Sequence, residues 1–573
     1  MVSISLKRSY SGWTRFFPCL SWLPKINRHT LKADFVAGLT VALVAIPQSL
    51  AYAQLAGVPA YYGLYAALLP VIVGALLGSS PLLSTGPVAM TSLLTAASVM
   101  TFAPYGSEQF YSYVILIALL SGIIQIGLGV GRMGRLINFL SYPVLHGFIN
   151  AAAIIIGLSQ LPAMLGLKLK NSEHFLSDIL HVIEHFDRIH LLSMAFGVTA
   201  LILLLVIKKI APKLPGVLIV VSLGILASWL IGFETDGGKV VGVIPRGLPS
   251  LSMPKVNYQA SMHLLPAAFV IAIISFMEAM SSSKIIAIKT RTRWDENQEL
   301  IGQGCAKIMA AFSHSMPVSG SFSRSALNLI AGAKTGLASV FSAGMVLIVL
   351  LFFTPVLYHL PKPVLSAVIM AAVFNLLNFK EFRDAWRARK DDGIAAVVTF
   401  FATLLFAPNI QNGILTGMIL SLIMFLYRTM QPDIVILGKD EQGVLRDAER
   451  FNLPKLHPRL MAIRFTGHLY FANVAYVNDS VLRIIGNDPE LRIILIVGDG
   501  INSLDASGVE MFINLRERLQ MAGITLAFCN LRENVTSVMQ RTGLDTIIGR
   551  ENIFVSENQA LDALNRRLNG VDQ

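Results

Sequence analysis

The chain has 573 residues, of which 54% are hydrophobic and 14% charged, and its mean hydropathy is +0.63. This composition excludes an ordinary soluble protein of that length. Charge is unevenly distributed, because residues 1–431 hold 31 Lys and Arg against 16 Asp and Glu, whereas residues 432–573 hold 15 against 18. We therefore expect a basic membrane domain followed by a slightly acidic soluble domain, and no nucleic-acid partner.

The first thirty residues place Trp13, Phe16, Phe17 and Trp22 among basic residues. They lack a compact apolar core followed by small cleavage residues, so we do not expect a cleaved signal peptide. An amphipathic segment lying on the cytoplasmic membrane face fits this pattern better.

Residues 31–430 contain fourteen candidate membrane spans, several of them short. Every second connection is basic, which under the positive-inside rule predicts that both chain ends are cytoplasmic. Cytoplasmic ends require an even number of crossings, so twelve spans with re-entrant segments would also fit. We predict a multi-pass protein of the cell (inner) membrane. The basic connections contain Lys7, Arg8, Arg15, Lys25, Arg28 and Lys32, then Arg132 and Arg135, then Lys208, Lys209 and Lys213, then Lys284, Lys289, Arg291 and Arg293, and finally Lys380, Arg383, Arg387, Arg389 and Lys390.

Two segments interrupt the hydrophobic region at matching places in its two halves, Ser84–Ala89 and Gly320–Ser325. Short hydrophobic segments broken by small residues in both halves are typical of a transporter's binding site. Each helix amino terminus offers free N–H groups and roughly half a positive charge. Two such termini facing each other near the bilayer midplane predict a pocket for an anion.

The first segment predicts a helix that starts at Gly86, since Pro87 loses no needed hydrogen bond in a first helical turn. In the second segment, Ser321 and Ser323 can cap a helix or reach a ligand, and Arg324 adds a full charge suited to oxyanions. The alternatives are a simple kink at Gly86, hydroxyls bonded to their own backbone, and an Arg324 that pairs with a neighbouring helix.

Polar residues in two other spans are further candidates. Gln48 and Tyr52 stand one helical turn apart on the same face, and helix-packing hydrogen bonds are the alternative role. Glu278 is a lone carboxylate in an apolar run, where the protonated form is favoured. Proton binding there would couple to anion binding, and the alternative is a structural salt bridge to Arg324 or Lys307.

Histidines and cysteines do not indicate a metal or cofactor. His174, His181, His185 and His190 lie in residues 171–190, which we predict to be an extracellular amphipathic helix with a solvated face. The three cysteines, Cys19, Cys305 and Cys529, have no paired spacing, so neither disulfides nor zinc is implied.

The tail alternates between strand and helix. Residues 491–497 and 524–528 read as buried strands, whereas 506–521 and 533–541 show helical spacing. This alternation predicts a small α/β domain with a largely parallel sheet. Asp505 or Ser507 can cap the helix that follows the loop 499–508.

Several short motifs together resemble one family. Ala45–Ala53, Tyr62–Tyr65, Gly78–Ser80 and Gly86–Ala89 resemble the first three helices of SulP (sulfate permease) anion transporters, and Gly320–Asn328 resembles their tenth. The tail, with Asp505–Gly508, resembles the STAS domain of that family, which is itself similar to anti-sigma-factor antagonists. The similarity runs from about residue 31 to residue 568.

The resemblance implies fourteen transmembrane helices in two inverted repeats of seven, with core and gate domains and a cytoplasmic STAS domain, in a protein that forms homodimers. It also directs Gln48 and Tyr52 toward the substrate. Proton-coupled members carry a carboxylate at the place of Glu278, and Ser507 matches a position that is phosphorylated in the antagonists.

The expected division is residues 1–30 for the amino-terminal segment, 31–430 for transport and 431–573 for STAS. The predicted substrate-binding residues are Gln48, Tyr52, Thr85, Gly86, Val88, Ala89, Ser321, Phe322, Ser323 and Arg324.

These observations predict a non-enzymatic importer of an inorganic oxyanion, with sulfate carried by proton symport through alternating access. Moving one charge against the membrane potential costs about 2.3 kcal/mol per 100 mV, so a dianion needs at least two protons for electroneutral entry. Glu278 supplies one carrier and His314 is a speculative second. Bicarbonate or dicarboxylate transport, sodium coupling, and an exchanger or channel of the same fold remain open.

Other classes are weaker alternatives. An intramembrane serine protease would need His314 held against Ser321 or Ser323, and a nucleobase carrier would lack the Ser–Arg pair and the tail. A channel-like or sensory protein is a further alternative. The expected partners are the anion, protons, membrane lipid, a second copy of the chain and a cytoplasmic protein that binds the STAS domain.

Overall fold

A computed structural model of the protein describes residues 17–134, 141–167, 181–182, 184–211, 214–374, 376–407, 409–486 and 488–570. The chain divides into two compact units, Met1–Ser421 and Leu422–Gln573, here called the helical unit and the tail unit. The predictions for residues 1–16 and for most of the helix at 171–190 lie outside the described residues.

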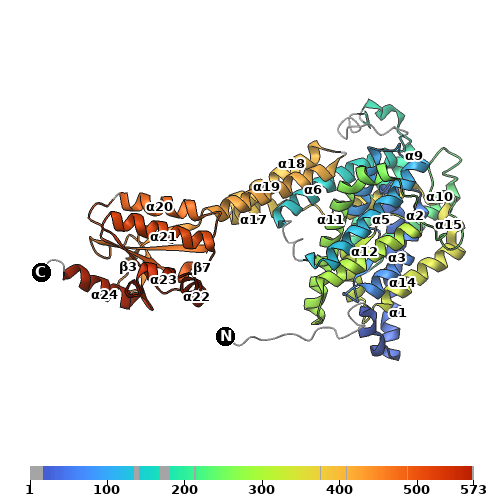
Figure 1. Ribbon diagram of the computed structural model, residues 1–573. Coiled ribbons are helices and arrows are strands. Elements are labelled where there is room, and N and C mark those ends of the chain that lie inside the picture. The colour runs from blue at the N-terminus through green and yellow to red at the C-terminus, as the bar shows by residue number, and fades with distance from the viewer. Residues whose placement is uncertain are drawn as a thin grey trace. The chain divides into compact units, whose positions relative to one another are not determined.

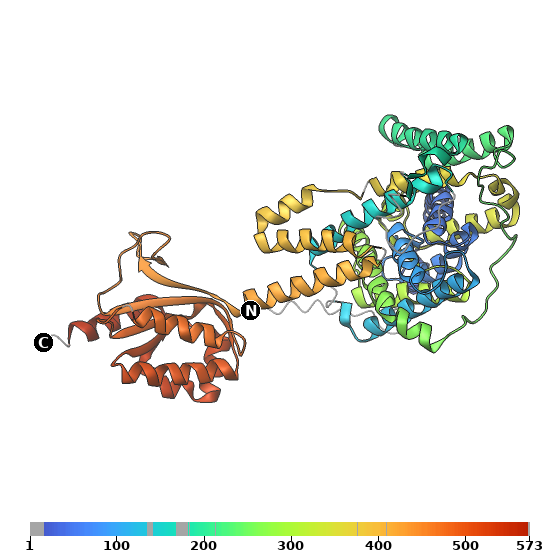
Figure 2. The ribbon, with the colours of Figure 1, turned by 90° about the horizontal axis from the view of Figure 1, so that it is seen from above.

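The helical unit is a bundle in which α1 lies among the other helices when seen from above (Figure 2), while its start projects at one edge of the bundle (Figure 1). Its last helix, α19, continues past residue 421 into the tail unit. Its helices are α1 (Arg28–Leu55), α2 (Ala60–Ala66), α3 (Leu69–Leu77), α4 (Ala89–Met100), α5 (Glu108–Val130), α6 (Tyr142–Ser159), α7 (Leu161–Met164), α9 (Leu191–Ile210), α10 (Gly216–Ile231), α11 (Tyr258–Thr290), α12 (Glu296–Phe312), α13 (Phe322–Ile330), α14 (Leu337–Ile348), α15 (Thr354–Tyr358), α16 (Lys362–Phe374), α17 (Lys380–Ala388), α18 (Lys390–Leu405) and α19 (Ile410–Met430).

Within the described ranges, eight helical stretches are long and apolar enough to cross a membrane, and three shorter apolar helices accompany them. The helical unit is therefore a multi-pass membrane domain, as the composition predicts. The number of fourteen crossings stays a prediction.

The first helix, α1, is fixed at its start and irregular in its middle. Asn27 caps it by accepting the N–H groups of His29 and Thr30, and Thr30 completes a capping box. Pro47 lies inside the helix and has no N–H to donate. The polar residue Gln48 therefore follows directly after a break in the hydrogen bonds of the helix.

Helices α5 and α12 pack closely because glycines meet between them. A Cβ added at Gly122 would lie 2.8 Å from the carbonyl oxygen of Gly304, and one added at Gly304 would lie 2.7 Å from that of Gly122. These two helices therefore approach nearly backbone to backbone. The contact helps to fix α12, which carries several side chains of the candidate site.

The tail unit contains a seven-stranded sheet with strand order β4-β3-β5-β6-β8-β9, in which β7 also pairs with β5. Pairings among β5, β6, β7, β8 and β9 are parallel, whereas β3 and β4 form an antiparallel edge. The expected α/β domain is thus confirmed, including both strands and both helices read from the sequence. The elements are β3 (Asp433–Lys439), β4 (Leu445–Asp447), β5 (Leu460–Leu469), α20 (Val474–Gly486), β6 (Ile493–Val497), β7 (Ile501–Leu504), α21 (Ala506–Met521), β8 (Thr525–Cys529), α22 (Glu533–Thr542), α23 (Leu544–Ile548), β9 (Ile553–Phe554) and α24 (Glu557–Asn569).

Alternate residues of the central strands enter two separate cores. Ile494 and Ile496 pack with residues of α20, α21, α22 and α23, whereas Leu495 and Val497 pack with residues of α24. This alternation follows from the two-residue period of a strand. Because both faces are covered, the strand reads as a continuous apolar run in the sequence.

Candidate anion-binding site

The two interrupted segments meet in space. Strand β1 (Ser84–Gly86) pairs antiparallel with β2 (Ser319–Ser321), and the register places Ser84 opposite Ser321 and Gly86 opposite Ser319. All residues of both strands are buried. Helix α4 follows the first strand and α13 follows the second, so both helices begin beside this short ladder.

The first of these helices starts later than predicted. Helix α4 begins at Ala89 with Val88 as its N-cap, so the prediction of a helix that starts at Gly86 is wrong. Gly86 instead continues the pairing with β2, and its φ of +152° lies in a region that favours glycine. Pro87 therefore precedes the helix rather than occupying its first turn, and Val88 and Ala89 are buried at the start.

The second helix begins as predicted. Ser321 is the N-cap of α13, and its hydroxyl accepts a hydrogen bond from the Arg324 N–H at 3.4 Å. Ser323 Oγ lies 3.4 Å from Ser321 Oγ. The side chains of Phe322 and Ser323 are exposed, whereas Ser321 and Arg324 on either side of them are buried.

Arg324 joins the two interrupted segments. Its side chain is only 2% exposed, and Nη1 donates to the carbonyl oxygen of Pro87 at 2.9 Å. Nη2 has no hydrogen-bond partner among the described residues. A Cβ added at Gly86 would lie 2.9 Å from Nη2, so only glycine leaves this nitrogen unobstructed. A buried donor without a partner is costly, and Nη2 is therefore available to a ligand.

Helix α1 supplies two further polar side chains. Helix α1 packs against both α4 and α13, and Gln48 and Tyr52 are 8% and 7% exposed. Within the described chain, Gln48 Oε1 is a buried atom without a partner. Tyr52 and Arg324 lie close enough to interact electrostatically. The structure thus brings these α1 residues and the Arg324 region together.

Glu278 lies on α11 beside the second strand. Its Oε2 accepts a hydrogen bond from Ser319 Oγ at 3.1 Å, and the same hydroxyl lies 2.8 Å from the carbonyl oxygen of Ser275. Among the described residues, neither Lys307 nor Arg324 places a nitrogen within 4.0 Å of the Glu278 carboxylate. The alternative of a direct structural salt bridge is therefore wrong.

Lys307 is a buried cation near the candidate site, and the sequence predicted it only as an alternative partner of Glu278. Its side chain is fully buried, and Nζ donates to Gln125 Oε1 at 2.8 Å and Ser275 Oγ at 2.7 Å. The signal in the sequence is a single lysine within the second half of an apolar helix. Ser275 thus contacts both groups through different atoms, since its hydroxyl accepts from Lys307 and its carbonyl oxygen lies next to the Ser319 hydroxyl that bonds Glu278.

The hydroxyl of Thr85 is held by protein. Its Oγ1 accepts a hydrogen bond from Gln303 Nε2 at 2.9 Å, and the same amide lies 3.0 Å from Glu299 Oε1. Glu299 Oε2 in turn accepts the backbone N–H of Ser80 at 2.9 Å. The Thr85 side chain therefore faces α12, and its contribution to a ligand would come from the backbone of β1.

His314 is engaged away from both serines of the second segment. Its Nε2 is hydrogen-bonded to Ser252 Oγ, a residue of the segment that precedes α11. A serine hydrolase would need the imidazole of His314 within reach of Ser321 or Ser323. The geometry thus argues against the serine protease reading and against His314 as a proton carrier in the site.

The described histidines near residue 185 bond within their own helical turn. His181 Nδ1 lies 3.0 Å from Glu184 Oε2, and His185 Nδ1 lies 2.9 Å from the His181 carbonyl oxygen. These three side chains could hold a metal ion by distance, but His181 and Glu184 are exposed. His174 lies outside the described residues.

In the tail unit, Asp505 rather than Ser507 caps α21. Asp505 Oδ1 accepts the Gly508 N–H at 2.9 Å, and its Oδ2 accepts the Phe471 N–H at 3.1 Å. Ser507 lies in the first turn of α21, where it lines a hollow of about 520 Å³ between α20 and α21. The Ser507 hydroxyl is thus free of the capping role.

The fold and the paired helix starts define the class of this protein, a multi-pass membrane transport protein with an appended α/β domain. Residues 31–403 match the model of the sulfate permease family, and residues 454–560 match that of the STAS domain. The chain belongs to the sulfate permease family, as the motifs predicted.

Relatives are similar over almost the whole chain. It is 32% identical to the probable sulfate transporter 4.2 of Arabidopsis thaliana, and the aligned region covers 95% of this chain and 83% of that relative. It is 31% identical to the probable sulfate transporter MT1781 of Mycobacterium tuberculosis, covering 97% and 99%.

Solved structures share the fold. The murine Solute Carrier 26 family member A9 anion transporter, in the inward-facing state, aligns with a TM-score of 0.89 at 22% identity, covering 98% of this chain and 96% of that one. The transmembrane domain of the cyanobacterium bicarbonate transporter BicA aligns with a TM-score of 0.58 at 22% identity, covering 69% and 98%.

Proposed function

We propose that this protein imports sulfate together with protons by alternating access, and that the anion binds between the starts of α4 and α13. The single observation that carries the proposal is Arg324, whose buried Nη2 has no partner among the residues that the structure describes and lies beside two helix amino termini. The names of the relatives quoted above favour sulfate over other oxyanions.

The charges near the site suit a divalent anion. Two helix termini supply roughly one positive charge together, and the guanidinium of Arg324 supplies a second. The guanidinium also offers N–H groups in a planar fork that matches an oxyanion better than an ammonium group does. Gln48 and Tyr52 on α1, with Ser321, Phe322 and Ser323 on the other side, would complete the site.

The hydrogen bonds of Glu278 support a role in proton coupling. Ser319 has one hydroxyl proton but two acceptors in reach, Glu278 Oε2 and the Ser275 carbonyl oxygen. When Glu278 is ionised, only one of these two acceptors can receive the Ser319 proton. When Glu278 is protonated, it donates to Ser319, and Ser319 donates to Ser275. Protonation would therefore satisfy the network and also remove a negative charge near the incoming anion.

The remaining assignments are part of the same proposal. Both chain ends lie in the cytoplasm of a cell whose inner membrane holds the protein as a homodimer, and residues 431–573 serve regulation or assembly, with Ser507 as a phosphorylation site. A bicarbonate or dicarboxylate carrier, coupled to protons or sodium, is the second candidate, because the transmembrane domain of a bicarbonate transporter shares the fold.

Uptake by purified protein in liposomes tests the proposal. Labelled sulfate, bicarbonate and a dicarboxylate are compared under imposed proton and sodium gradients. We expect sulfate uptake that is driven by an inward proton gradient and insensitive to sodium. Uptake of bicarbonate but not of sulfate would overturn the choice of substrate, and dependence on sodium alone would overturn the choice of coupling ion.

Arg324 variants test the position of the site. Arg324→Ala should weaken sulfate binding at least about tenfold and weaken binding of a monovalent anion less, because a full charge opposite a dianion is lost. Arg324→Lys keeps the charge and should restore part of the binding. Equal losses for both anions in Arg324→Ala, without rescue by lysine, would indicate a packing role through Pro87.

A further inference from the structure

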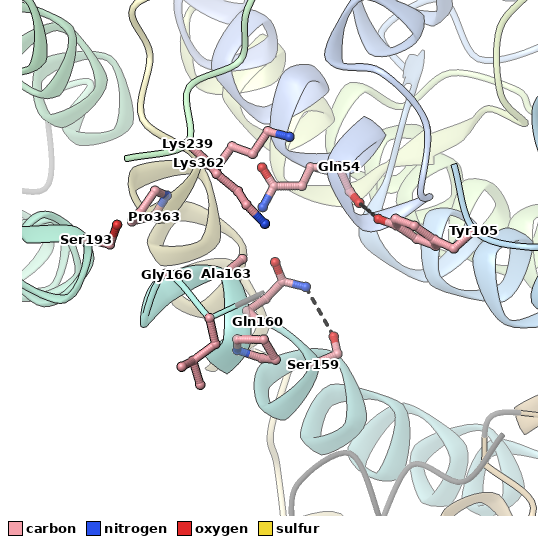
Figure 3. Close-up of a pocket in the computed structure, with 12 residues that line it drawn as sticks. Gln54, Tyr105, Ser159, Gln160, Ala163, Gly166, Ser193, Lys239, Lys362 and Pro363 are labelled. Atoms are coloured by element: carbon pink, nitrogen blue, oxygen red, sulfur yellow. Dashed lines mark hydrogen bonds between the residues drawn. The ribbon is translucent and has the colours of Figure 1, made fainter. Parts of the chain in front are cut away.

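A hollow of about 220 Å³ lies at the end of the helical unit where α1 and α6 finish and α9 and α16 begin. Figure 3 shows Lys239, Lys362 and Gln54 along one side of this hollow and Gln160 across from them. A single water molecule needs about 10–15 Å³. The hollow therefore has room for a small oxyanion with part of its hydration shell.

Among the described residues that line the hollow, two are lysines, Lys239 and Lys362, and none is a carboxylate. Lys239 and Lys362 are held next to each other, because the Lys362 N–H donates to the Lys239 carbonyl oxygen at 2.9 Å. In the part of the chain that the structure describes, neither ammonium group has a carboxylate within 4.0 Å. Lys239 is exposed and Lys362 is partly buried, and two like charges on neighbouring backbone segments repel each other, so an anion between them would be stabilised by both.

The acidic residues of the preceding loop have other partners. Glu234 accepts the Tyr358 hydroxyl at 2.9 Å, and Asp236 faces His190, with 3.6 Å between Oδ2 and Nε2. The amide of Gln54 is fixed by a hydrogen bond from Nε2 to Ser366 Oγ at 3.0 Å. Within the described parts of the chain, these acidic groups therefore do not neutralise the two lysines of the hollow.

We propose that this hollow is a second anion site, which captures a divalent inorganic oxyanion on the non-cytoplasmic side before the central site receives it. The inference rests on the proposed function for its orientation and ligand class. The carboxyl-terminal end of α1, opposite its basic start at Arg28, forms one wall of the hollow. Clustered charge in a concave site raises the local concentration and the association rate of its counter-ion.

The test replaces both lysines in the full-length protein, as Lys239→Gln with Lys362→Gln. Lys255→Gln is the matched control, because Lys255 is an exposed lysine of the same connection between α10 and α11 but does not line the hollow. Initial rates of sulfate uptake are measured against external sulfate at low and high ionic strength.

We expect the double variant to raise the KM for external sulfate roughly tenfold at low ionic strength with an unchanged maximal rate. The difference should shrink at high ionic strength, because salt screens the capture of the anion. A KM equal to that of the unmodified protein, or an equal change in Lys255→Gln, would overturn the proposal.

Equilibrium binding of labelled sulfate separates this proposal from the proposed function. In an Arg324→Ala background we expect residual sulfate binding that the two lysine substitutions abolish, whether or not the protein transports sulfate. Residual binding that survives both lysine substitutions, or no residual binding at all, would show that the hollow is not an anion site.

Discussion

At the scale of single residues, the candidate site depends on side chains whose bonding capacity the protein only partly uses. One nitrogen of Arg324 donates to the carbonyl oxygen of Pro87. Among the described residues, its other terminal nitrogen, Nη2, and the buried Oε1 of Gln48 have no partner. Elsewhere in the same region, Thr85 and Ser319 are fully engaged with protein. The unpaired atoms of Arg324 and Gln48 are therefore available to a ligand.

Glu278→Gln tests the coupling role. Glutamine cannot release a proton but can still donate to Ser319, so it imitates the protonated carboxyl group. We expect uptake that no longer responds to an inward proton gradient, whereas anion exchange across the membrane stays measurable. The measurement is sulfate flux in liposomes with and without the gradient.

Glu299→Gln is the matched control for this experiment. Glu299 is also a buried carboxylate of the helical unit, but it binds Ser80 and Gln303 rather than Ser319. The control should keep its response to the proton gradient. A response that persists in Glu278→Gln and vanishes in Glu299→Gln would move the coupling role to Glu299.

Gly86→Ala tests whether the strand beside Arg324 needs glycine. The added methyl group would lie 2.9 Å from Nη2 in a backbone conformation that alanine rarely adopts. Crowding of this kind costs about 1–3 kcal/mol, so we expect sulfate binding to weaken about fivefold or more.

Gly127→Ala serves as the comparison, because a Cβ at Gly127 of α5 meets nothing within 4 Å. Both variants are purified and compared by sulfate binding and by thermal unfolding. Full binding in Gly86→Ala would show that Nη2 of Arg324 does not face the anion.

At the scale of elements, the sequence predicts the first residue of a helix when a side chain caps it. It does not do so when strand pairing with a distant segment keeps the preceding residues out of the helix. Ser321 caps α13 as its hydroxyl predicts, whereas α4 begins three residues later than Gly86. The sequence around Pro87 contains a helix signal, but β1 pairs with a strand from the other half of the helical unit. No local pattern reveals such a long-range pairing.

Substitution of Asp505 tests whether its side chain caps α21. Asp505→Ala removes the acceptor for Gly508 and for Phe471, and loss of an N-cap typically costs about 1 kcal/mol. We expect faster amide hydrogen exchange in the first turn of α21 in the full-length protein. Asp505→Asn keeps a capping oxygen and should exchange nearly as slowly as the unmodified chain, and slow exchange in Asp505→Ala would assign the cap to Ser507 instead.

At the scale of the whole molecule, the placement of basic residues predicts the orientation in the membrane. Lys239 lies in the connection between α10 and α11, and Lys390 begins α18 in a strongly basic connection. Under the positive-inside rule these two positions face opposite sides.

Accessibility of introduced cysteines tests this orientation. In a background without Cys19, Cys305 and Cys529, an impermeant maleimide applied to intact cells should label Lys239→Cys and spare Lys390→Cys. Permeabilised cells should label both. Labelling of Lys390→Cys in intact cells would reverse the proposed orientation and place the lysine hollow on the cytoplasmic side.

The sequence by itself determined the class of the protein, the division between a membrane part and an α/β tail, the family, and the two segments that form the candidate site. These properties follow from composition, periodicity and short motifs, which are local features of the chain. Tertiary structure alone decided that β1 pairs with β2, that Glu278 bonds Ser319 rather than a cation, that Lys307 is buried behind it, and that Lys239 and Lys362 share a hollow. Each of these contacts joins residues that are distant along the chain, and their geometry depends on how the helices pack rather than on the residues next to them.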